Sequence, residues 1–342
     1  MIQSLNLNDI GYESRVDVKD GKASMITYPR IHMFSLDLSD KLNIRSGGMG
    51  ISITTTPIKV SAEICDKNEV HSSLYKEDIL KTLDSLRQNL SITHGWKVKI
   101  DAPSIDHVGM GSATQIIGSI IMTVSAVSNI KLTLDEIVNL GIGQVSCVGL
   151  SLLYSPGFLI EFGYLSSPVP KPGYFKHPVI PNLYQKSTGS VMKLITPKNW
   201  NIILATPLNS QSISGKLEDG FWSKHLPATY QSSLEICYSN LMLVIPSIIS
   251  GNFNELIIGL NQIISQGTKP IEESIQNPNT KELLKQLRKK YNFASVSSLG
   301  PSVYTISQTE PSVQELKLFK QEFSDYNFTF FPMSLEGCKK KL

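Results

Sequence analysis

The sequence lacks the patterns that place a chain among disulfide-rich, metal-binding or membrane-spanning proteins. Its four cysteines are scattered, with no CxxC pair and no spacing typical of metal ligands. We interpret them as reduced thiols of a cytoplasmic protein. Residues 1–9 are polar and contain no hydrophobic signal core. The longest apolar segments, 116–127 and 241–249, are shorter than the roughly 18 residues of a membrane span, so we expect a soluble protein with no membrane partner.

Charge is sparse and nearly balanced. The chain has 32 Lys and Arg against 29 Asp and Glu, a formal net charge of +3. The one dense basic run, residues 339–341, we interpret as a solvated tail. This distribution argues against a nucleic-acid surface and is compatible with a small polyanionic substrate.

The composition is that of a globular protein with more than one core. Hydrophobic residues make up 41% and charged residues 18% of the chain. A length of 342 residues exceeds one typical core and predicts two domains. Because residues 166–190 are rich in Pro and Ser, we interpret them as a linker between a first domain, 1–165, and a second, 191–342.

In the first half, the pattern predicts strands interrupted by helices. Residues 22–38 predict one long strand or a strand pair. A glycine cluster at 47–50 opens another strand, and 58–64 is predicted to be its hairpin partner. Leucines on one side of 76–90 indicate an amphipathic helix. A capping-box pattern predicts a short helix over 133–140.

The second half alternates strands and helices, after a polar loop at 210–220 that follows its first two strands. We expect strands at 191–195, 200–205, 293–296, 303–306 and 327–331, and helices at 229–247, 253–265, 281–291 and 312–325. Strand–helix–strand units of this kind predict a ferredoxin-like α+β sandwich.

A glycine-rich turn at 109–114 separates a predicted strand, 96–102, from the apolar run 116–127. Glycines let a backbone approach a ligand closely, and the unpaired amides of a helix start favour an anion such as phosphate. The same residues also fit an ordinary helix start with Ser112 or Thr114 as N-cap. The turn alone leaves these two interpretations evenly balanced.

Arg30 and His32 share one face of the predicted strand 22–38, because strand side chains repeat with a period of two. They form either a polar surface pair or an anion clamp. Periodicity alone favours the surface pair.

Three segments together resemble the motifs of the GHMP kinase superfamily: Pro-Arg-Ile-His at 29–32, Gly-Met-Gly-Ser-Ala-Thr-Gln at 109–115, and Ser-Ser-Leu-Gly-Pro-Ser at 297–302. Two details are more similar to the β-ribofuranosylaminobenzene 5′-phosphate synthase family. Gly-Gly-Met-Gly at 47–50 follows the first motif, and Thr-Gln stands where the kinases usually carry Ser-Ala-Ala. The resemblance extends over residues 22–308.

The resemblance implies an α+β, GHMP-kinase-like fold of two domains, an N-terminal ribosomal-protein-S5-like domain and a C-terminal ferredoxin-like domain, with the site in the cleft. It implies a transferase that joins 5-phosphoribosyl 1-pyrophosphate to an aromatic acid such as 4-aminobenzoate. That reaction forms a C–C glycosidic bond and releases carbon dioxide and pyrophosphate, an early step of methanopterin biosynthesis. Relatives use it on other aromatic acids to build C-nucleosides. The alternatives are an ATP-dependent small-molecule kinase and a paralogue that only binds ligand. The resemblance also implies a homodimer.

The resemblance further implies roles for individual residues. Arg30 and His32 would be catalytic and would neutralise the 5-phosphate or the aromatic carboxylate. Glu161, in a predicted strand at 158–163, would take the place of a family Asp. Mg²⁺ would accompany the pyrophosphate, with Asp106 as a metal contact. The residues expected to bind substrate phosphate are His107, Gly109, Gly111, Ser112, Thr114, Gln115, Ser146, Ser297, Ser298 and Gly300.

The middle motif departs from the family pattern, which is close to Gly-Arg-Gly-x-x-Ser-x-x-Gly. Ile142 stands at the Arg position, whereas Ser146 and Gly149 are retained. Isoleucine cannot replace a guanidinium fork. The departure predicts an acceptor other than 4-aminobenzoate, or a paralogue with altered or absent activity. In the second half, residues 214–218 are similar to a loop of the family's second domain.

Overall fold

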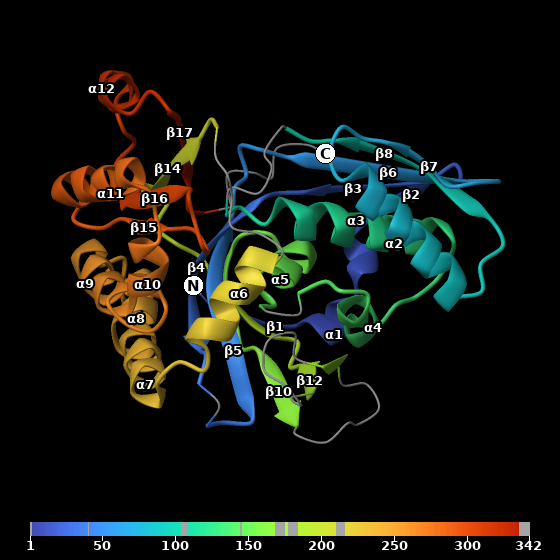
Figure 1. Cartoon of the computed structure of the whole chain (residues 1–342), viewed down its shortest axis with the longest axis horizontal. Coiled ribbons are helices and arrows are strands. Elements are labelled where there is room, and N and C mark those ends of the chain that lie inside the picture. The colour runs from blue at the N-terminus through green and yellow to red at the C-terminus, as the bar shows by residue number, and fades with distance from the viewer. Residues whose placement is uncertain are drawn as a thin grey trace.

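The computed structural model contains three β-sheets with helices packed between and around them (Figure 1). The residues that it describes are 2–39, 41–103, 109–143, 146–167, 175–176, 184–209 and 216–334. Asp106, His107, the loop residues 210–215 and the basic run 339–341 lie outside the described residues.

One sheet of the first half has five strands in the order β2-β3-β6-β8-β7. The strands are β2 (Asp17–Lys19), β3 (Lys22–Thr27), β6 (Ile58–Cys65), β8 (Gly95–Asp101) and β7 (Glu69–His71). Helices α2 (Lys76–Asn89) and α3 (Ser112–Val127) lie on its inner face (Figure 1). The expected helix at 76–90 is confirmed, and so is a helix across 116–127.

The second sheet has eight strands. Seven follow the order β1-β13-β9-β5-β10-β12-β11, and the eighth, β4, also pairs with β5. The strands are β1 (Ile2–Asn6), β13 (Ser190–Leu194), β9 (Phe158–Glu161), β5 (Ile44–Ser52), β10 (Tyr164–Ser167), β12 (Tyr184–Ser187), β11 (Phe175–Lys176) and β4 (Arg30–Asp37). The segment 22–38 is therefore a strand pair, and its two strands belong to different sheets.

Two strand assignments differ from the expectation. Strand β6 pairs with β3 and β8, so it is not the hairpin partner of β5, which pairs instead with β4 and β9. Strand β13, expected to begin the second domain, pairs with β1 and β9 in the first-half sheet. Alternation identifies a strand and its buried face, but it carries no information on which strand lies alongside.

Four short elements complete the first half: α1 (Leu7–Ile10), a 3₁₀ turn (Tyr12–Arg15), α4 (Leu134–Asn139) and α5 (Val148–Tyr154). The predicted capping box of α4 is confirmed, because Thr133 Oγ1 accepts from Glu136 N at 3.2 Å and Thr133 N donates to Glu136 Oε2 at 2.7 Å. Helix α5 was not expected. All of its residues are buried, so it has no amphipathic pattern.

The second half contains an antiparallel sheet in the order β15-β16-β14-β17. Its strands are β14 (Asn201–Pro207), β15 (Ser295–Val296), β16 (Val303–Ser307) and β17 (Tyr326–Pro332). The helices are α6 (Lys216–His225), α7 (Tyr230–Ser239), a π-helical turn (Asn240–Val244), α8 (Ile245–Ser250), α9 (Phe253–Ile264), α10 (Lys269–Ser274), α11 (Pro278–Tyr291) and α12 (Val313–Glu322). This strand order confirms the ferredoxin-like arrangement. Helix α6 lies where part of a polar loop was expected.

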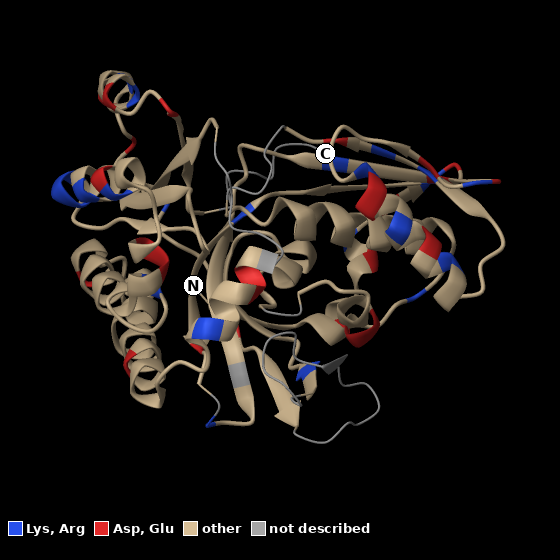
Figure 2. Ribbon diagram, viewed as in Figure 1, with Lys and Arg blue, Asp and Glu red and all other residues tan. Residues whose placement is uncertain are grey.

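The continuous helical run Tyr230–Ser250, at 21 residues, is long and apolar enough to span a membrane by length and composition. In the fold it packs on β4 and α9, and Ile236, Val244 and Ile248 are buried in the second core. The run is therefore a helix of the folded protein and does not indicate a membrane protein. Acidic and basic side chains occur together on α2 and α11, in keeping with the balanced charge (Figure 2).

The eight-stranded sheet separates two hydrophobic cores. Leu159 on one face packs with α3 and α5, whereas Ile31, Met33 and Met49 on the other face pack against the second half. Because side chains alternate along a strand, Arg30 and His32 point away from Ile31 and Met33, toward α3 and α5. The eight-stranded sheet, which lies between the two cores, therefore contains Arg30 and His32 of the first motif.

Candidate active site

The three motif segments meet in one hydrogen-bonded cluster. The Arg30 backbone N–H, at the start of β4, donates to Met110 O at 2.8 Å, and Arg30 Nη1 donates to Gly109 O at 3.1 Å. Ser297, after β15, donates from Oγ to the same Gly109 O at 2.7 Å. Arg30 and Ser297 thus contact the same carbonyl, and Ser297 lies 188 positions after Gly109 in the sequence.

The third motif, residues 297–302, is also hydrogen-bonded directly to β4. The His32 backbone N–H donates to Ser297 Oγ at 3.1 Å, and Ser298 N donates to His32 O at 3.1 Å. Ser297 therefore links the glycine turn to the strand. The predicted convergence of Arg30, His32 and the serine loop is present in the structure.

The glycines of the turn are required by close packing. A Cβ on Gly109, at φ +81°, would lie 2.4 Å from Ser297 O and 2.8 Å from Gly300 O. A Cβ on Gly111, at φ +61°, would lie 2.8 Å from Arg30 Cζ. Both positions need a left-handed conformation that favours glycine, and both bring the backbone close to a neighbour.

Helix α3 begins at this turn without a side-chain cap. Gly111 is the N-cap residue, and no described side chain accepts from the first-turn amides as a cap. Ser112 Oγ contacts Tyr75 OH at 3.1 Å. Neither Ser112 nor Thr114 is the N-cap of this 16-residue helix. Amides at the start of a helix favour an anion where no cap accepts from them.

The guanidinium of Arg30 lies beside these amides, and one of its N–H donors is bonded to no described residue. Its Nε is buried and has no hydrogen-bond partner within the described part of the chain. Burial lowers the pKa of Arg30 to about 10, partly offset by the carboxylate of Glu218 on α6. Arg30 is therefore charged at neutral pH, and a buried unpaired donor of this kind favours an acceptor on a ligand.

His32 is buried, and its ring contacts Ser146 through Nε2 and Oγ at 3.2 Å. Burial, followed by the positive charges of Arg30 and Lys269, holds the pKa of His32 well below its ordinary value. The imidazole is neutral at pH 7. Without a bound anion the neutral ring supplies a hydrogen bond and no charge, and the role of His32 toward a substrate anion stays a prediction.

Glu161 ends β9 on the same side of the sheet as His32. It is the cross-strand partner of Gly48, and a Cβ on Gly48 would lie 3.4 Å from His32 Nε2. The carboxylate is 1% exposed, accepts from Gly163 N at 2.6 Å through Oε2, and leaves Oε1 without a partner among the described residues. Burial raises the pKa of Glu161 to about 7.

Because the pKa of Glu161 is higher in the folded than in the unfolded chain, we expect stability to fall as pH rises from about 4.5 to about 7 and then to level off. Replacing Glu161 with Gln removes the titrating group and keeps an oxygen for Gly163 N. The variant should lose this slope and gain on the order of 1–3 kcal/mol of unfolding free energy at pH 8 relative to the parent. Urea unfolding at pH 5 and pH 8 measures both quantities. Parallel pH profiles for the two proteins would contradict the assignment.

Gln115 was expected to bind phosphate, but the structure turns it inward. It is fully buried, accepts from Thr27 Oγ1 at 2.5 Å and donates to Gly149 O at 2.7 Å. Its amide joins β3, α3 and α5 and is not placed to contact a substrate. One turn into the helix, position 115 faces the core, which the motif pattern could not show.

Ile142, at the position where the family pattern has Arg, belongs to the first core and is 5% exposed. Its Cγ2 lies 3.5 Å from the position that a Cβ on Gly118 of α3 would take. Where the family pattern has a charged Arg side chain, this chain has an apolar contact between Ile142 and the first core.

The described residues do not form a protein-held magnesium site. They contain no group of three or more His, Cys, Asp or Glu side chains that could bind a metal ion. The Glu161 carboxylate points to Gly163, and Asp106 lies outside the described residues.

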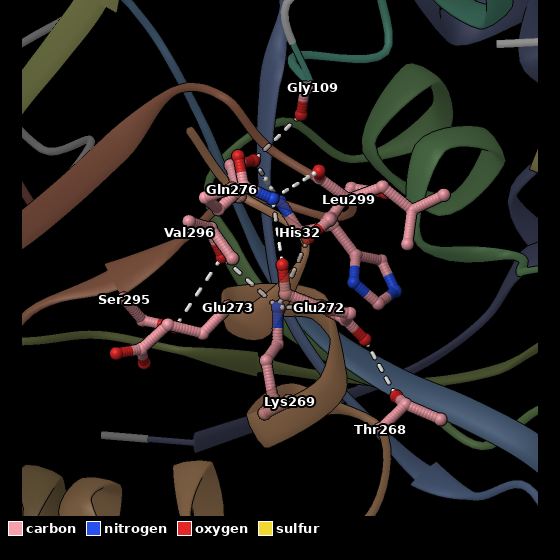
Figure 3. Close-up of polar contacts among 12 residues, drawn as sticks. His32, Gly109, Thr268, Lys269, Glu272, Glu273, Gln276, Ser295, Val296 and Leu299 are labelled. Carbon is pink, nitrogen blue, oxygen red and sulfur yellow. Dashed lines mark hydrogen bonds and ion pairs between the residues drawn. The ribbon is translucent and has the colours of Figure 1, made fainter. Parts of the chain in front are cut away.

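Two buried residues that support the site, Lys269 and Gln276, could not be identified from the sequence. Lys269 of α10 contacts the backbone on both sides of Ser297, and Gln276 contacts the next carbonyl, Leu299 O (Figure 3). A single Lys at the start of α10 and a single Gln after its end carry no periodic signal, so only the packed structure identifies them.

Known proteins resemble this chain in sequence and in fold. No family model matches it. The β-ribofuranosylphenol 5′-phosphate synthase of Methanothermobacter thermautotrophicus is 26% identical over 300 residues, which cover 83% of this chain and 88% of the relative. The enzyme of the same name from Methanocaldococcus jannaschii is 25% identical over 303 residues, covering 84% and 90%.

Solved structures with the same fold include two GHMP kinases. Homoserine kinase from Cytophaga hutchinsonii has a TM-score of 0.59 and 13% identity, covering 92% of this chain and 95% of its own. Mevalonate kinase from L. major has a TM-score of 0.56 and 12% identity, covering 96% and 99%. At this identity the likeness concerns the fold alone. In motifs and in sequence the chain is thus similar to the β-ribofuranosylaminobenzene (β-ribofuranosylphenol) 5′-phosphate synthases, and its fold is that of the GHMP kinases.

Proposed function

We propose that this enzyme is a 5-phosphoribosyl 1-pyrophosphate-dependent, decarboxylating C-ribosyltransferase that acts on an aromatic acid. The sequence relatives are named for a ribofuranosylphenol product. A phenol results when a 4-hydroxybenzoate ring gains the ribosyl group and loses its carboxylate. We therefore propose 4-hydroxybenzoate as the preferred acceptor over 4-aminobenzoate. Ile142, at the position where the family pattern has Arg, agrees with a changed acceptor.

The observation that carries the proposal is the start of α3 next to Arg30. Uncapped first-turn amides, two close-packed glycines and an unpaired guanidinium Nε converge on one place. Donors fixed in advance around a developing anion stabilise it without reorganisation. Pyrophosphate leaving from C1 of the ribose is such an anion.

The bond changes need positioning more than an enzyme nucleophile. The C1–O bond of the ribose breaks and its electron pair leaves with pyrophosphate. The ring carbon that bears the carboxylate supplies the pair for the new C–C bond. Carbon dioxide then departs and leaves its bonding pair in the ring, which restores aromaticity. Holding the two substrates in contact supplies much of the rate.

His32 and Glu161 suit the acceptor side of this reaction. The neutral His32 ring offers a hydrogen bond near the anion site. Glu161, with a pKa of about 7, exchanges a proton readily at neutral pH and suits contact with the hydroxyl group of the acceptor. We also propose that Mg²⁺ enters with the pyrophosphate and that the enzyme is a cytoplasmic homodimer, which light scattering of the purified protein tests.

A direct assay separates the candidate functions. The enzyme is incubated with 5-phosphoribosyl 1-pyrophosphate, Mg²⁺ and either 4-hydroxybenzoate or 4-aminobenzoate, and pyrophosphate and carbon dioxide are measured. We expect equal amounts of both products with 4-hydroxybenzoate. ATP turnover with homoserine or mevalonate would instead indicate a kinase. Binding of 5-phosphoribosyl 1-pyrophosphate without turnover over a panel of acids would indicate a paralogue that only binds ligand.

A further inference from the structure

A buried ion pair on α10 lies directly behind the third motif. Lys269 and Glu272 are 5% and 4% exposed, and Lys269 Nζ lies 2.7 Å from Glu272 Oε2. Thr268 Oγ1 donates to the other carboxylate oxygen at 2.6 Å. Buried ion pairs contribute little net stability, because desolvation offsets the attraction. The location of this pair therefore suggests a role other than stability.

Lys269 is bonded to the loop that carries Ser297. Its ammonium group donates to Val296 O at 3.0 Å and to Ser298 O at 3.5 Å, the carbonyls on either side of that serine (Figure 3). Glu272 is the counter-ion of this ammonium group. Lys269 thus holds the backbone carbonyls at both neighbours of Ser297.

Gln276 holds the next part of the same loop. Its Nε2 donates to Leu299 O at 2.9 Å and to Glu272 O at 2.7 Å. A Cβ on Gly300 would lie 2.5 Å from Gln276 Oε1, so this side chain packs closely on the loop. Lys269 and Gln276 together contact the loop from residue 296 to residue 300.

The loop held in this way makes the contacts that join the motifs. Ser297 Oγ bridges Gly109 O and His32 N, and Ser298 adopts a left-handed conformation at φ +54° while its N–H donates to His32 O. A left-handed non-glycine residue is strained, so neighbouring contacts must hold it in place. The bond from Lys269 to Ser298 O is one such contact.

We infer that Lys269, supported by Glu272 and Gln276, is a positioning residue that sets the serine loop against the glycine turn and keeps a positive charge close to His32. The inference rests on the proposed function for its effect on catalysis. Its two structural consequences, the loop position and the charge, can be measured without turnover.

The charge has a consequence for the ionisation of His32. The charged groups that face the ring are Arg30 from β4 and Lys269 from α10, the latter paired with Glu272, and Glu161 lies across β5 on the same face. Ser146, the direct contact of the ring, is neutral. Lys269 is among the groups that lower the pKa of His32 and Glu272 is not, so removing the two together should raise that pKa.

The test variant replaces Lys269 and Glu272 together with Gln, so that no unpaired charge is left buried. We expect the pKa of His32, followed by NMR of labelled histidine, to rise. We also expect the affinity for inorganic pyrophosphate with Mg²⁺, measured by calorimetry, to fall about 10-fold or more. A loop displacement of this kind should also lower kcat more than it raises KM, since misplacement of about 1 Å can cost on the order of 100-fold in rate.

Two control variants separate positioning from general stability. Gln276→Leu loosens the loop without removing a charge, and it should weaken pyrophosphate binding while the pKa of His32 stays at the parent value. Arg288→Met removes the ion pair with Glu273 of α10, at 2.6 Å, and the bonds of Arg288 to Ala294 O, which precedes residues 296–300 of the loop. It should leave both measurements unchanged. If the paired variant does not fold, Gln276→Leu still decides whether the loop position sets pyrophosphate affinity.

An unchanged His32 titration in the folded paired variant, or parent-like pyrophosphate affinity in Gln276→Leu, would overturn the inference. Failure of the proposed function is a different result. It would be seen as no release of carbon dioxide by the parent enzyme with any acid, whereas the His32 titration and pyrophosphate binding would still decide the role of Lys269.

Discussion

Replacing Gly109 with Ala should lower kcat/KM for 5-phosphoribosyl 1-pyrophosphate by at least about 100-fold, which corresponds to about 2.7 kcal/mol. The added Cβ would lie 2.4 Å from Ser297 O and 2.8 Å from Gly300 O. Both obstacles are backbone atoms, which cannot rotate away as a side-chain end does. The third motif must therefore move, and Ser297 then loses its bond to Gly109 O.

A matched control isolates this clash from backbone strain. Gly141 also has positive φ, at +97°, but a Cβ there would meet no atom within 4 Å. Gly141→Ala should cost about 1–2 kcal/mol of stability, because a left-handed alanine is strained, with little change in pyrophosphate affinity. Thermal unfolding and calorimetry on both variants make the comparison. Equal effects on affinity would show that the contact between the glycine turn and the serine loop is not needed for binding.

Much of the fold was predictable because most of its elements carry a local pattern. The helix at 76–90, the capping box at Thr133 and the strands of the second half were identified from periodicity and end signals. The pairing of β6 with β3 and β8 was not, because pairing depends on packing across the whole domain. Helix α5 was missed because it is buried on all sides.

The site was predictable where residue type alone fixes the chemistry. Glycines at 109 and 111 and an arginine at 30 are needed for close approach and charge, and the structure brings them together. The orientation of Gln115 and the neutral state of His32 follow from burial, which one sequence does not report. Lys269 acts through backbone carbonyls, so no partner side chain could point to it.

Replacing Arg30 with Lys should reduce kcat/KM by about 100- to 1,000-fold, although the charge is conserved. Arg30 Nη1 is engaged with Gly109 O at 3.1 Å, while its Nε remains buried and free of any partner among the described residues. Arginine can therefore brace the glycine turn and bind an anion with different atoms of one rigid plane. Lysine has a single nitrogen on a flexible chain, and it must either bond Gly109 O or reach the anion.

The comparison is made with Arg87→Lys on α2, where the guanidinium donates to Thr93 O at 3.1 Å, away from the three motifs. We expect parent-like kcat/KM in that variant and parent-like unfolding in both. Calorimetry with pyrophosphate then assigns the loss in Arg30→Lys to anion binding. If Arg30→Lys retained full pyrophosphate affinity, the unpaired Nε would have no role in holding the leaving group, and the anion would depend on the amides of α3 alone. The amides and the guanidinium can thus be separated experimentally, because only the guanidinium is changed by this substitution.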